Sequence, residues 1–189
     1  MTVTTPPSCT AFNGQQRFAS GTLASLAPAL KALVERTPDA QLLIFDDNTG
    51  AQLDLNLQGS LDDVLARLPR PAAAETRGAG RPKLGVVGRE VTLLPRHWDW
   101  LNAQPGGASV ALRKLVEHGL RDNQQVDRQR MAREAAYRFI SALAGDQPGF
   151  EEASRALFAA DRQGYVDHMA DWPADVREHA IVMAQDSFA

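Results

Sequence analysis

The run from Pro69 to Lys83, "PRPAAAETRGAGRPK", sets the strongest limit on how this chain can fold. It is rich in proline, alanine and glycine, and its apolar residues follow neither the period of a helix nor that of a strand. Such a segment has no regular apolar face that a core could bury, so we expect a basic, flexible linker at 70–83. A chain of 189 residues must then build separate folded parts on its two sides.

Residues 8–69 have the pattern of a small α+β module in the order ββαββα. Asn13-Gly14 lies between two short runs and predicts a hairpin turn, where positive φ angles are needed. An apolar stripe predicts a helix that follows an N-cap at Thr22. The runs "QLLIFDD" and "AQLDLNL" predict two strands joined by the turn "DNTG". Ser60 and Asp63 predict a capped helix that closes the module.

The net charge of −3 conceals an uneven distribution. The stretch from Arg77 to Arg121 holds eight positive and three negative side chains, a balance of +5, so the rest of the chain carries −8. A basic centre between acidic flanks favours a negatively charged partner, such as nucleic acid.

Residues 84–121, within this basic centre, have the pattern of a strand followed by two helices. Arg89–Leu94, "REVTLL", is the expected strand, and Pro95 opens the first helix. Gly106-Gly107 predicts a helix stop, and Ser109 is the expected N-cap of the second helix. Units this small usually need a partner to cover their apolar stripes. We therefore expect a homodimer that pairs the strands and packs the helices together.

This order of strand, Pro-opened helix, Gly turn and Ser-capped helix resembles the ribbon-helix-helix family of bacterial DNA-binding proteins. The resemblance implies that paired strands enter the major groove of duplex DNA. In one register Arg89, Val91 and Leu93 would face the bases; in the other, Glu90 and Thr92 would. The resemblance also implies that Ser109 and Val110 hold a phosphate at the start of the second helix.

The linker carries a second feature related to DNA. "GRPK", Gly80 to Lys83, contains the Gly-Arg-Pro core of AT-hook-like segments, in which an extended arginine enters a narrow minor groove. Arg81 and Lys83 are therefore candidate DNA-binding residues, and a solvated linker is the alternative interpretation.

Residues 122–189 predict a helical region. The first expected helix ends near Gly145, and the last begins at an N-cap on Asp171 with Pro173 in its first turn. The expected core positions of the first helix are Val126, Ala135, Phe139, Ile140 and Leu143.

The whole chain, from "GRPKLGV" through "LPRHWDWL" and "GGASVALRKLVE" to "WPADVREH", is similar to a bacterial family catalogued only as a domain of unknown function. This likeness implies a bacterial source and no particular activity. It also implies that the second half of the chain belongs with the centre.

The chain lacks the residue patterns that catalysis or metal binding would need. The four histidines lack a metal-ligand spacing, and Asp46–Gly50 fits a turn better than a calcium loop. Cys9 falls in an expected disordered tail, away from any histidine. We therefore expect no enzyme activity, no cofactor and no metal site. A start without basic and apolar regions, and the lack of a long apolar run, predict a cytoplasmic protein outside the membrane.

Two functions remain open at this level. The first is a sequence-specific DNA-binding protein, a transcriptional regulator that acts as a dimer through Arg81, Lys83, Arg89, Thr92, Ser109 and Val110. The alternative is a protein-interaction or structural protein in which the same centre serves dimerisation only.

Overall fold

The computed structural model describes residues 8–69 and 87–189, which form two compact units. The first unit combines the N-terminal module with residues 126–189, and the second comprises residues 87–125. The helix α4 (Gly107–Leu143) contributes residues to both. The expected α+β class is confirmed, and the predicted linker at 70–83 lies outside the described residues.

The first unit begins with a β-hairpin. Strands β1 (Cys9–Asn13) and β2 (Gln16–Gly21) pair antiparallel, with Asn13 opposite Gln16. The hairpin at this point is confirmed, but its two loop residues are Gly14 and Gln15, one position later than predicted. Gly14 supplies the positive φ of +57° that the turn requires.

Strands β3 (Leu42–Asp46) and β4 (Gln52–Leu53) complete a four-stranded antiparallel sheet in the order β2-β1-β3-β4. The predicted turn between them is confirmed at residues 47–50. The strand predicted for "AQLDLNL" is much shorter than expected, but its three leucines do share one apolar cluster. Backbone pairing therefore ends early while the side-chain alternation continues.

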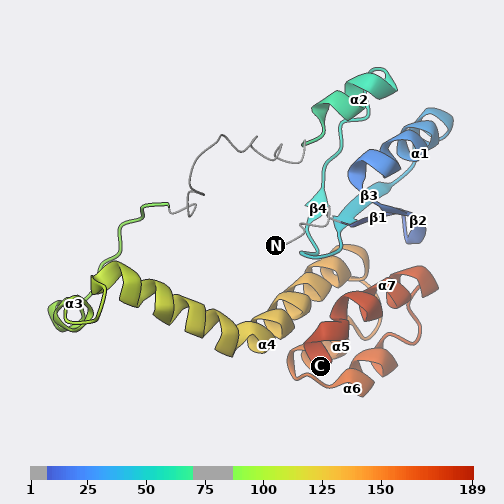
Figure 1. Ribbon diagram of the computed structural model, residues 1–189. Coiled ribbons are helices and arrows are strands. Elements are labelled where there is room, and N and C mark those ends of the chain that lie inside the picture. The colour runs from blue at the N-terminus through green and yellow to red at the C-terminus, as the bar shows by residue number, and fades with distance from the viewer. Residues whose placement is uncertain (1–7, 70–86) are drawn as a thin grey trace. The chain divides into compact units, whose positions relative to one another are not determined.

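The sheet separates two apolar clusters because successive side chains point to opposite faces. Cys9, Ala11 and Ile44 pack on α1 (Leu23–Arg36), whose N-cap Thr22 accepts a hydrogen bond from Ser25 N–H. On the other face, Phe12 and Phe45 pack against the C-terminal part of α4 and the helices that follow it (Figure 1). Cys9 is thus buried in β1, so the expectation of a disordered tail at this residue was wrong.

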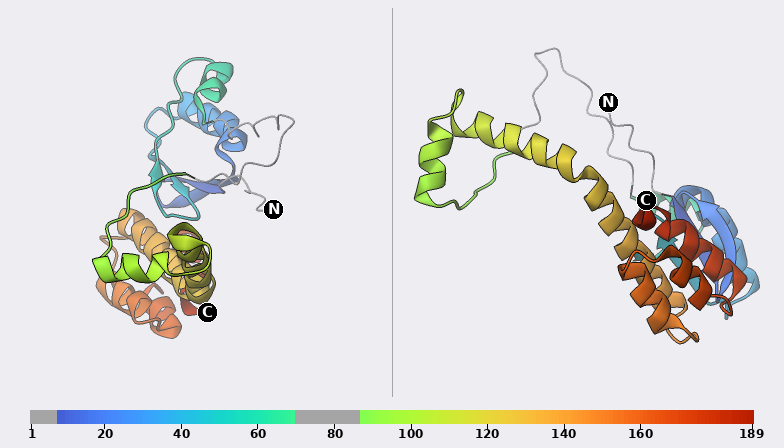
Figure 2. Two further views of the ribbon diagram at one scale, coloured as in Figure 1. Left: turned by 60° about the vertical axis from the view of Figure 1, so that its left-hand side comes forward. Right: turned by 90° about the horizontal axis from the view of Figure 1, so that it is seen from below.

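Three further helices and a terminal 3₁₀ turn follow α4 in the first unit (Figure 2). They are α5 (Phe150–Phe158), α6 (Arg162–His168), α7 (Ala174–Ala184) and η1 (Gln185–Phe188). Ala160, between α5 and α6, adopts a positive φ of 57°. The N-cap of α7 is Pro173 rather than Asp171.

The α4 residues that enter this core largely match the expectation. Ala135, Phe139, Ile140 and Leu143 are buried as predicted, and Val126 is exposed instead. Phe139 contacts Phe12 and Phe45 at ring-centroid distances of 5.4 and 5.1 Å. These aromatic contacts join the sheet to the helices within one core.

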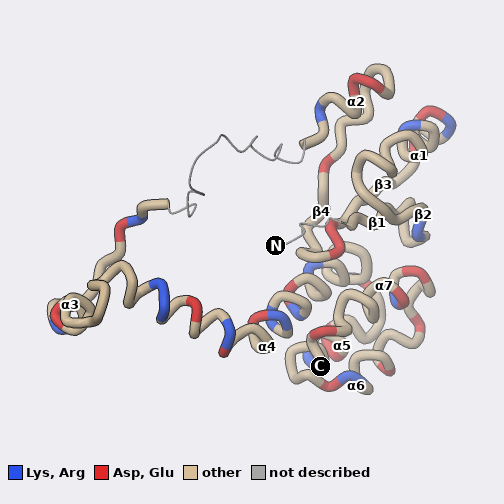
Figure 3. The backbone as a smooth tube through the Cα atoms, viewed as in Figure 1, with Lys and Arg blue, Asp and Glu red and all other residues tan. Residues whose placement is uncertain are grey.

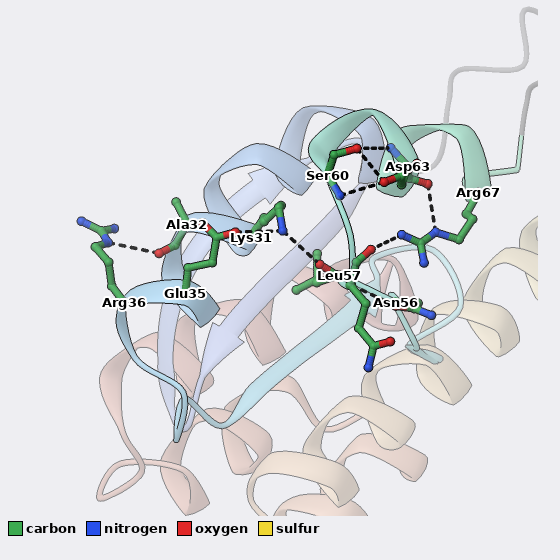
Figure 4. A network of polar contacts seen from close by, with 10 residues as sticks. Lys31, Ala32, Glu35, Arg36, Asn56, Leu57, Ser60, Asp63 and Arg67 are labelled. Atoms are coloured by element: carbon green, nitrogen blue, oxygen red, sulfur yellow. Dashed lines mark hydrogen bonds and ion pairs between the residues drawn. The ribbon is translucent and has the colours of Figure 1, made fainter.

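The helix α2 (Leu61–Arg67) begins with the predicted capping box (Figure 4). Ser60 Oγ accepts a hydrogen bond from Asp63 N–H at 3.2 Å, and Asp63 Oδ2 accepts one from Ser60 N–H at 2.8 Å. The two bonds satisfy two backbone donors that a helix start leaves free. This polar end contrasts with the apolar side chain of Val64, which is buried.

Candidate interaction surface

The second unit is a helical hairpin of α3 (Pro95–Asn102) and the first half of α4. Pro95 occupies the first helical position, as predicted, where its missing N–H is no loss. Gly106 and Gly107 have φ angles of +89° and +72°, and Gly107 N–H donates to Gln104 O at 2.9 Å. The predicted stop between the two helices is therefore confirmed.

The hairpin buries very little of its apolar surface. Within residues 87–125, Leu101 and Ala111 are the two buried apolar side chains. Beside them lies an apolar groove of about 390 Å³ between the two helices. Leu93, Trp100, Leu112 and Leu115 are among the residues that line it. Two buried apolar side chains fall well short of the core that an independent unit needs.

Five large apolar side chains of the hairpin face solvent, and we call them the α3–α4 surface. Trp100 is 53% exposed, Val116 58% and Leu120 64%. The other members are Leu94 and Leu115. Together they expose on the order of 400 Å² of apolar surface, from the typical areas of such side chains. Exposed apolar surface of this extent commonly marks a site of protein interaction.

The predicted ribbon has no counterpart within the described chain. Residues 87–94 are irregular and pair with none of its four strands, so the expected strand at Arg89–Leu94 is not observed. Arg89 and Thr92 are exposed on this irregular segment. The resemblance to ribbon-helix-helix proteins is therefore not supported.

The second helix also begins and ends elsewhere than predicted. It starts at Gly107, so Ser109 lies inside its first turn and is not an N-cap. Ser109 O accepts a hydrogen bond from Arg113 Nε at 3.1 Å. The helix then continues past residues 121 and 122, where the sequence places a domain boundary, and the division between the two compact units falls after residue 125.

Four of the predicted DNA-binding residues fall within the described part of the chain. Arg89 and Thr92 precede α3, whereas Ser109 and Val110 lie in the first turn of α4. No hydrogen bond between these two pairs occurs in the described part of the chain. Arg81 and Lys83 lie outside the described residues.

The helix α4 carries its charges on a different side from its apolar stripe. Val110, Arg113, Lys114, Glu117 and Arg121 line a shallow depression of about 240 Å³. Figure 3 shows basic and acidic positions alternating along this part of the helix. Glu117 lies 3.8 Å from Arg121, and His118 lies 3.2 Å from Asp122. Exposed pairs of this kind add little stability and leave the other cations available to a partner.

The first unit contains a polar pair, Asp47 and His179, that the sequence did not predict. His179 Nε2 on α7 lies 3.2 Å from Asp47 Oδ1 in the turn after β3, and their side chains are 7% and 21% exposed. The rings of Phe12 and Phe139 lie 5.6 and 4.8 Å from the imidazole. The available signal was the position of His179 on an apolar stripe with Val176, Ala180 and Met183.

The environment of Asp47 favours its charged form. Burial acts to raise the pKa of this carboxyl, but the polar side chains of His179, Ser8 and Thr10 beside it outweigh burial and hold the pKa below its usual value. The pair therefore joins the sheet to α7 as a polar contact inside an aromatic surrounding.

The described residues contain neither a candidate metal site nor a helix that could span a membrane. No group of three or more His, Cys, Asp or Glu side chains in residues 8–69 and 87–189 could hold a metal ion. Across the same residues, no helix combines the length and apolar character that a membrane span requires.

The four-stranded sheet with its helices, together with the helical hairpin of residues 87–125, makes this a mixed α+β protein. The chain belongs to the family described as "Uncharacterized protein conserved in bacteria (DUF2239)", whose model matches residues 8–184. The expected likeness to an uncharacterised bacterial family is thereby confirmed. No curated protein and no solved structure matches the chain.

Proposed function

We propose that this protein is a protein-interaction protein of the bacterial cytoplasm that forms a homodimer through the α3–α4 surface, and that it is not an enzyme. The observation that carries the proposal is the exposure of Leu94, Trp100, Leu115, Val116 and Leu120 on one small hairpin. Five large apolar side chains in water are unfavourable, and association removes them from it.

The size of the surface is right for a dimer. A standard interface buries about 800 Å² on each partner, somewhat more than half of it apolar, which is roughly 450 Å². The α3–α4 surface supplies a similar apolar area. Burying this area on two copies favours association through the hydrophobic effect.

The test is sedimentation equilibrium of the full chain over a range of concentrations from low micromolar upward. We expect a dimer, and we expect Val116→Glu combined with Leu120→Glu to make it monomeric. Val182→Glu is the matched control, because Val182 is 63% exposed on α7, outside the α3–α4 surface. A wild-type monomer at every concentration would refute the proposal, and so would a double variant that dimerises like the control.

A second candidate is a sequence-specific DNA-binding protein that acts in transcription regulation. The observation in its favour is the exposure of Arg113, Lys114 and Arg121 on α4, within the stretch of balance +5. Arg81, Lys83 and Arg89 would add cations along the chain. Lys and Arg side chains that displace counterions from phosphates provide most non-specific affinity for DNA.

This candidate is tested by fluorescence anisotropy with random-sequence duplex DNA between about 50 and 200 mM salt. A DNA-binding protein loses affinity steeply over this range, and replacing Arg113, Lys114 and Arg121 by Ala flattens the slope. Arg162→Ala is a control outside the basic centre. No binding at the lowest salt excludes DNA as a partner and leaves dimerisation as the function of the hairpin.

A further inference from the structure

We propose that two copies of α4 pack antiparallel about Val116, with Leu112 of each copy seated over Gly119 of the other. This inference rests on the proposed homodimer and specifies how its two surfaces meet. It assigns a partner and a register to a helix face on which Val116 and Leu120 are more than half exposed and Leu112 is half-buried.

A seam suited to helix pairing runs along this part of α4. Ser109, Leu112, Val116, Gly119 and Asn123 are spaced alternately by three and four residues. That spacing places all five on one face and is the repeat with which two helices pack side chains between one another. Leu115 and Leu120 border the seam, and both are exposed. The charged side chains Arg113, Lys114, Glu117 and Arg121 lie away from its centre.

No contact within the described chain explains why residue 119 is a glycine. Glycine is the least favourable residue in a helix interior apart from proline. A Cβ added at Gly119 would meet no atom of the described chain within 4 Å, so no contact there requires a glycine. Gly164 on α6 is different, because its Cβ would lie 2.3 Å from Asp161 Oδ2 and 3.3 Å from Ala156 Cβ. The missing side chain at Gly119 instead leaves a hollow on an exposed apolar face.

An antiparallel arrangement fills this hollow, and a parallel one does not. With a twofold axis at Val116, Leu112 of one copy falls between Gly119 and Leu120 of the other, so a large side chain meets a small one. In a parallel pair, Gly119 of one copy would face Gly119 of the other. This would leave a void at the interface, and well-packed protein cores contain few voids. The twofold arrangement also uses the same surface on both copies, as dimers commonly do.

The polar ends of the seam agree with the same register. Ser109 of one copy lies opposite Asn123 of the other, so a hydroxyl meets an amide. Asn123 Nδ2 already donates to Gly119 O at 2.8 Å within its own helix, which leaves the amide oxygen to accept. Arg113 and Glu117 lie on one flank of the seam, and antiparallel packing brings Arg113 near Glu117 of the second copy. Opposite charges on that flank favour this orientation over the parallel one.

The register is tested by crosslinking single cysteines in a Cys9→Ala background with a short bis-maleimide. Leu112 of the two copies is separated by about 12 Å along the helix axis in the antiparallel pair, from the 1.5 Å rise per residue. We therefore expect Leu112→Cys alone to give no crosslink, and an equimolar mixture of Leu112→Cys and Leu120→Cys to give a heterodimer crosslink. Circular dichroism checks that each variant keeps its helix content.

The hollow is tested by Gly119→Leu, which blocks the seat of Leu112. We expect the dimer dissociation constant to rise at least tenfold, although leucine favours the helix more than glycine does. Gln124→Leu is the matched control, because Gln124 is exposed on α4 away from the seam, and it leaves the constant unchanged.

The outcomes separate this inference from the proposed function. A crosslink from Leu112→Cys alone means a parallel pair, and a dimer with no crosslink in the mixture means another contact; either result overturns the register and keeps the homodimer. A dissociation constant unchanged by Gly119→Leu also overturns it. A monomer in sedimentation overturns both the register and the homodimer.

Discussion

Gly50 allows the turn after β3 to rest directly on α4, and replacing it with alanine should loosen that contact. Gly50 adopts a φ of +66°, and its N–H donates to Asp46 O at 2.8 Å. A Cβ at this position would lie 2.0 Å from Ala135 O and 2.7 Å from Ala135 C. Both are backbone atoms of a helix, so they cannot move aside as the end of a side chain would.

The size of the effect follows from two separate costs. A left-handed backbone conformation is unfavourable for alanine by about 1–2 kcal/mol. Forcing extra volume into a packed contact adds about 1–3 kcal/mol. Gly50→Ala should therefore lower the free energy of unfolding by about 2–5 kcal/mol, a large share of the roughly 5–15 kcal/mol that holds a typical domain together.

Gly14→Ala separates the two costs. Gly14 has a similar φ of +57°, but a Cβ there would meet nothing within 4 Å. It should lose only the conformational part, about 1–2 kcal/mol. Urea denaturation followed by far-ultraviolet circular dichroism measures both variants. Equal losses for Gly50→Ala and Gly14→Ala would refute the close approach of the turn to α4.

Three further outcomes are expected from the first unit. Ser60→Ala removes the side-chain half of the α2 capping box and should lower the free energy of unfolding by about 1 kcal/mol, measured by urea denaturation; no change would mean that the box does not hold α2. The pKa of Asp47 is lowered by folding, so its contribution to stability is present above the unfolded value of about 3.9 and lost as pH falls through the folded value. Asp47→Asn should then lose less stability than the wild type between neutral pH and pH 3 in urea titrations, and parallel losses would contradict this. Burial and the nearby carboxylates of Asp46 and Asp47 raise the pKa of Cys9 to about 11, so Cys9 should react slowly with a thiol reagent at pH 8 until urea unfolds the protein. Equally fast labelling with and without urea would contradict its burial.

Features that depend on neighbouring residues were predictable from the sequence. Thr22 and Ser60 are N-caps as expected, because a side-chain oxygen can reach an N–H only two or three residues away. The turn at 47–50 follows from the same short-range chemistry: Asp46 Oδ1 accepts from Asn48 and Thr49 N–H at 2.9 Å. Such bonds form wherever the chain turns, whatever the rest of the fold does.

The boundary predicted between residues 121 and 122 lies inside a continuous helix, and the division between the two compact units falls after residue 125. The predicted boundary followed a change in charge, and charge alone does not end a helix. Between Gly107 and Leu143 the sequence holds no proline, and Gly119 lies within the helix without a positive φ. With no residue that breaks the hydrogen-bond ladder, α4 continues.

The Asp47–His179 contact could not be read from either sequence position alone. Asp47 has the residue type that a turn favours, and His179 belongs to a helix far along the chain. The contact between Asp47 and His179 depends on the packing of α7 against the sheet. At the same interface, Arg17 N–H donates a hydrogen bond to Asp175 Oδ2 at 2.8 Å. Long-range contacts of this kind follow from the whole core, because no local pattern specifies the partner.

Both halves of α4 carry apolar side chains, but the rest of the chain buries those of the C-terminal half and leaves those of the N-terminal half exposed. In the C-terminal half, Ala135, Phe139 and Ile140 are buried by the sheet and by the helices that follow. In the N-terminal half, Val116 and Leu120 are more than half exposed, although they are as apolar as the buried set. A helix gains most of its stability from the packing of its apolar face rather than from propensity. Because residues 87–125 offer that half little beyond α3, the missing cover is best supplied by another chain, and a second copy brings a surface of matching size.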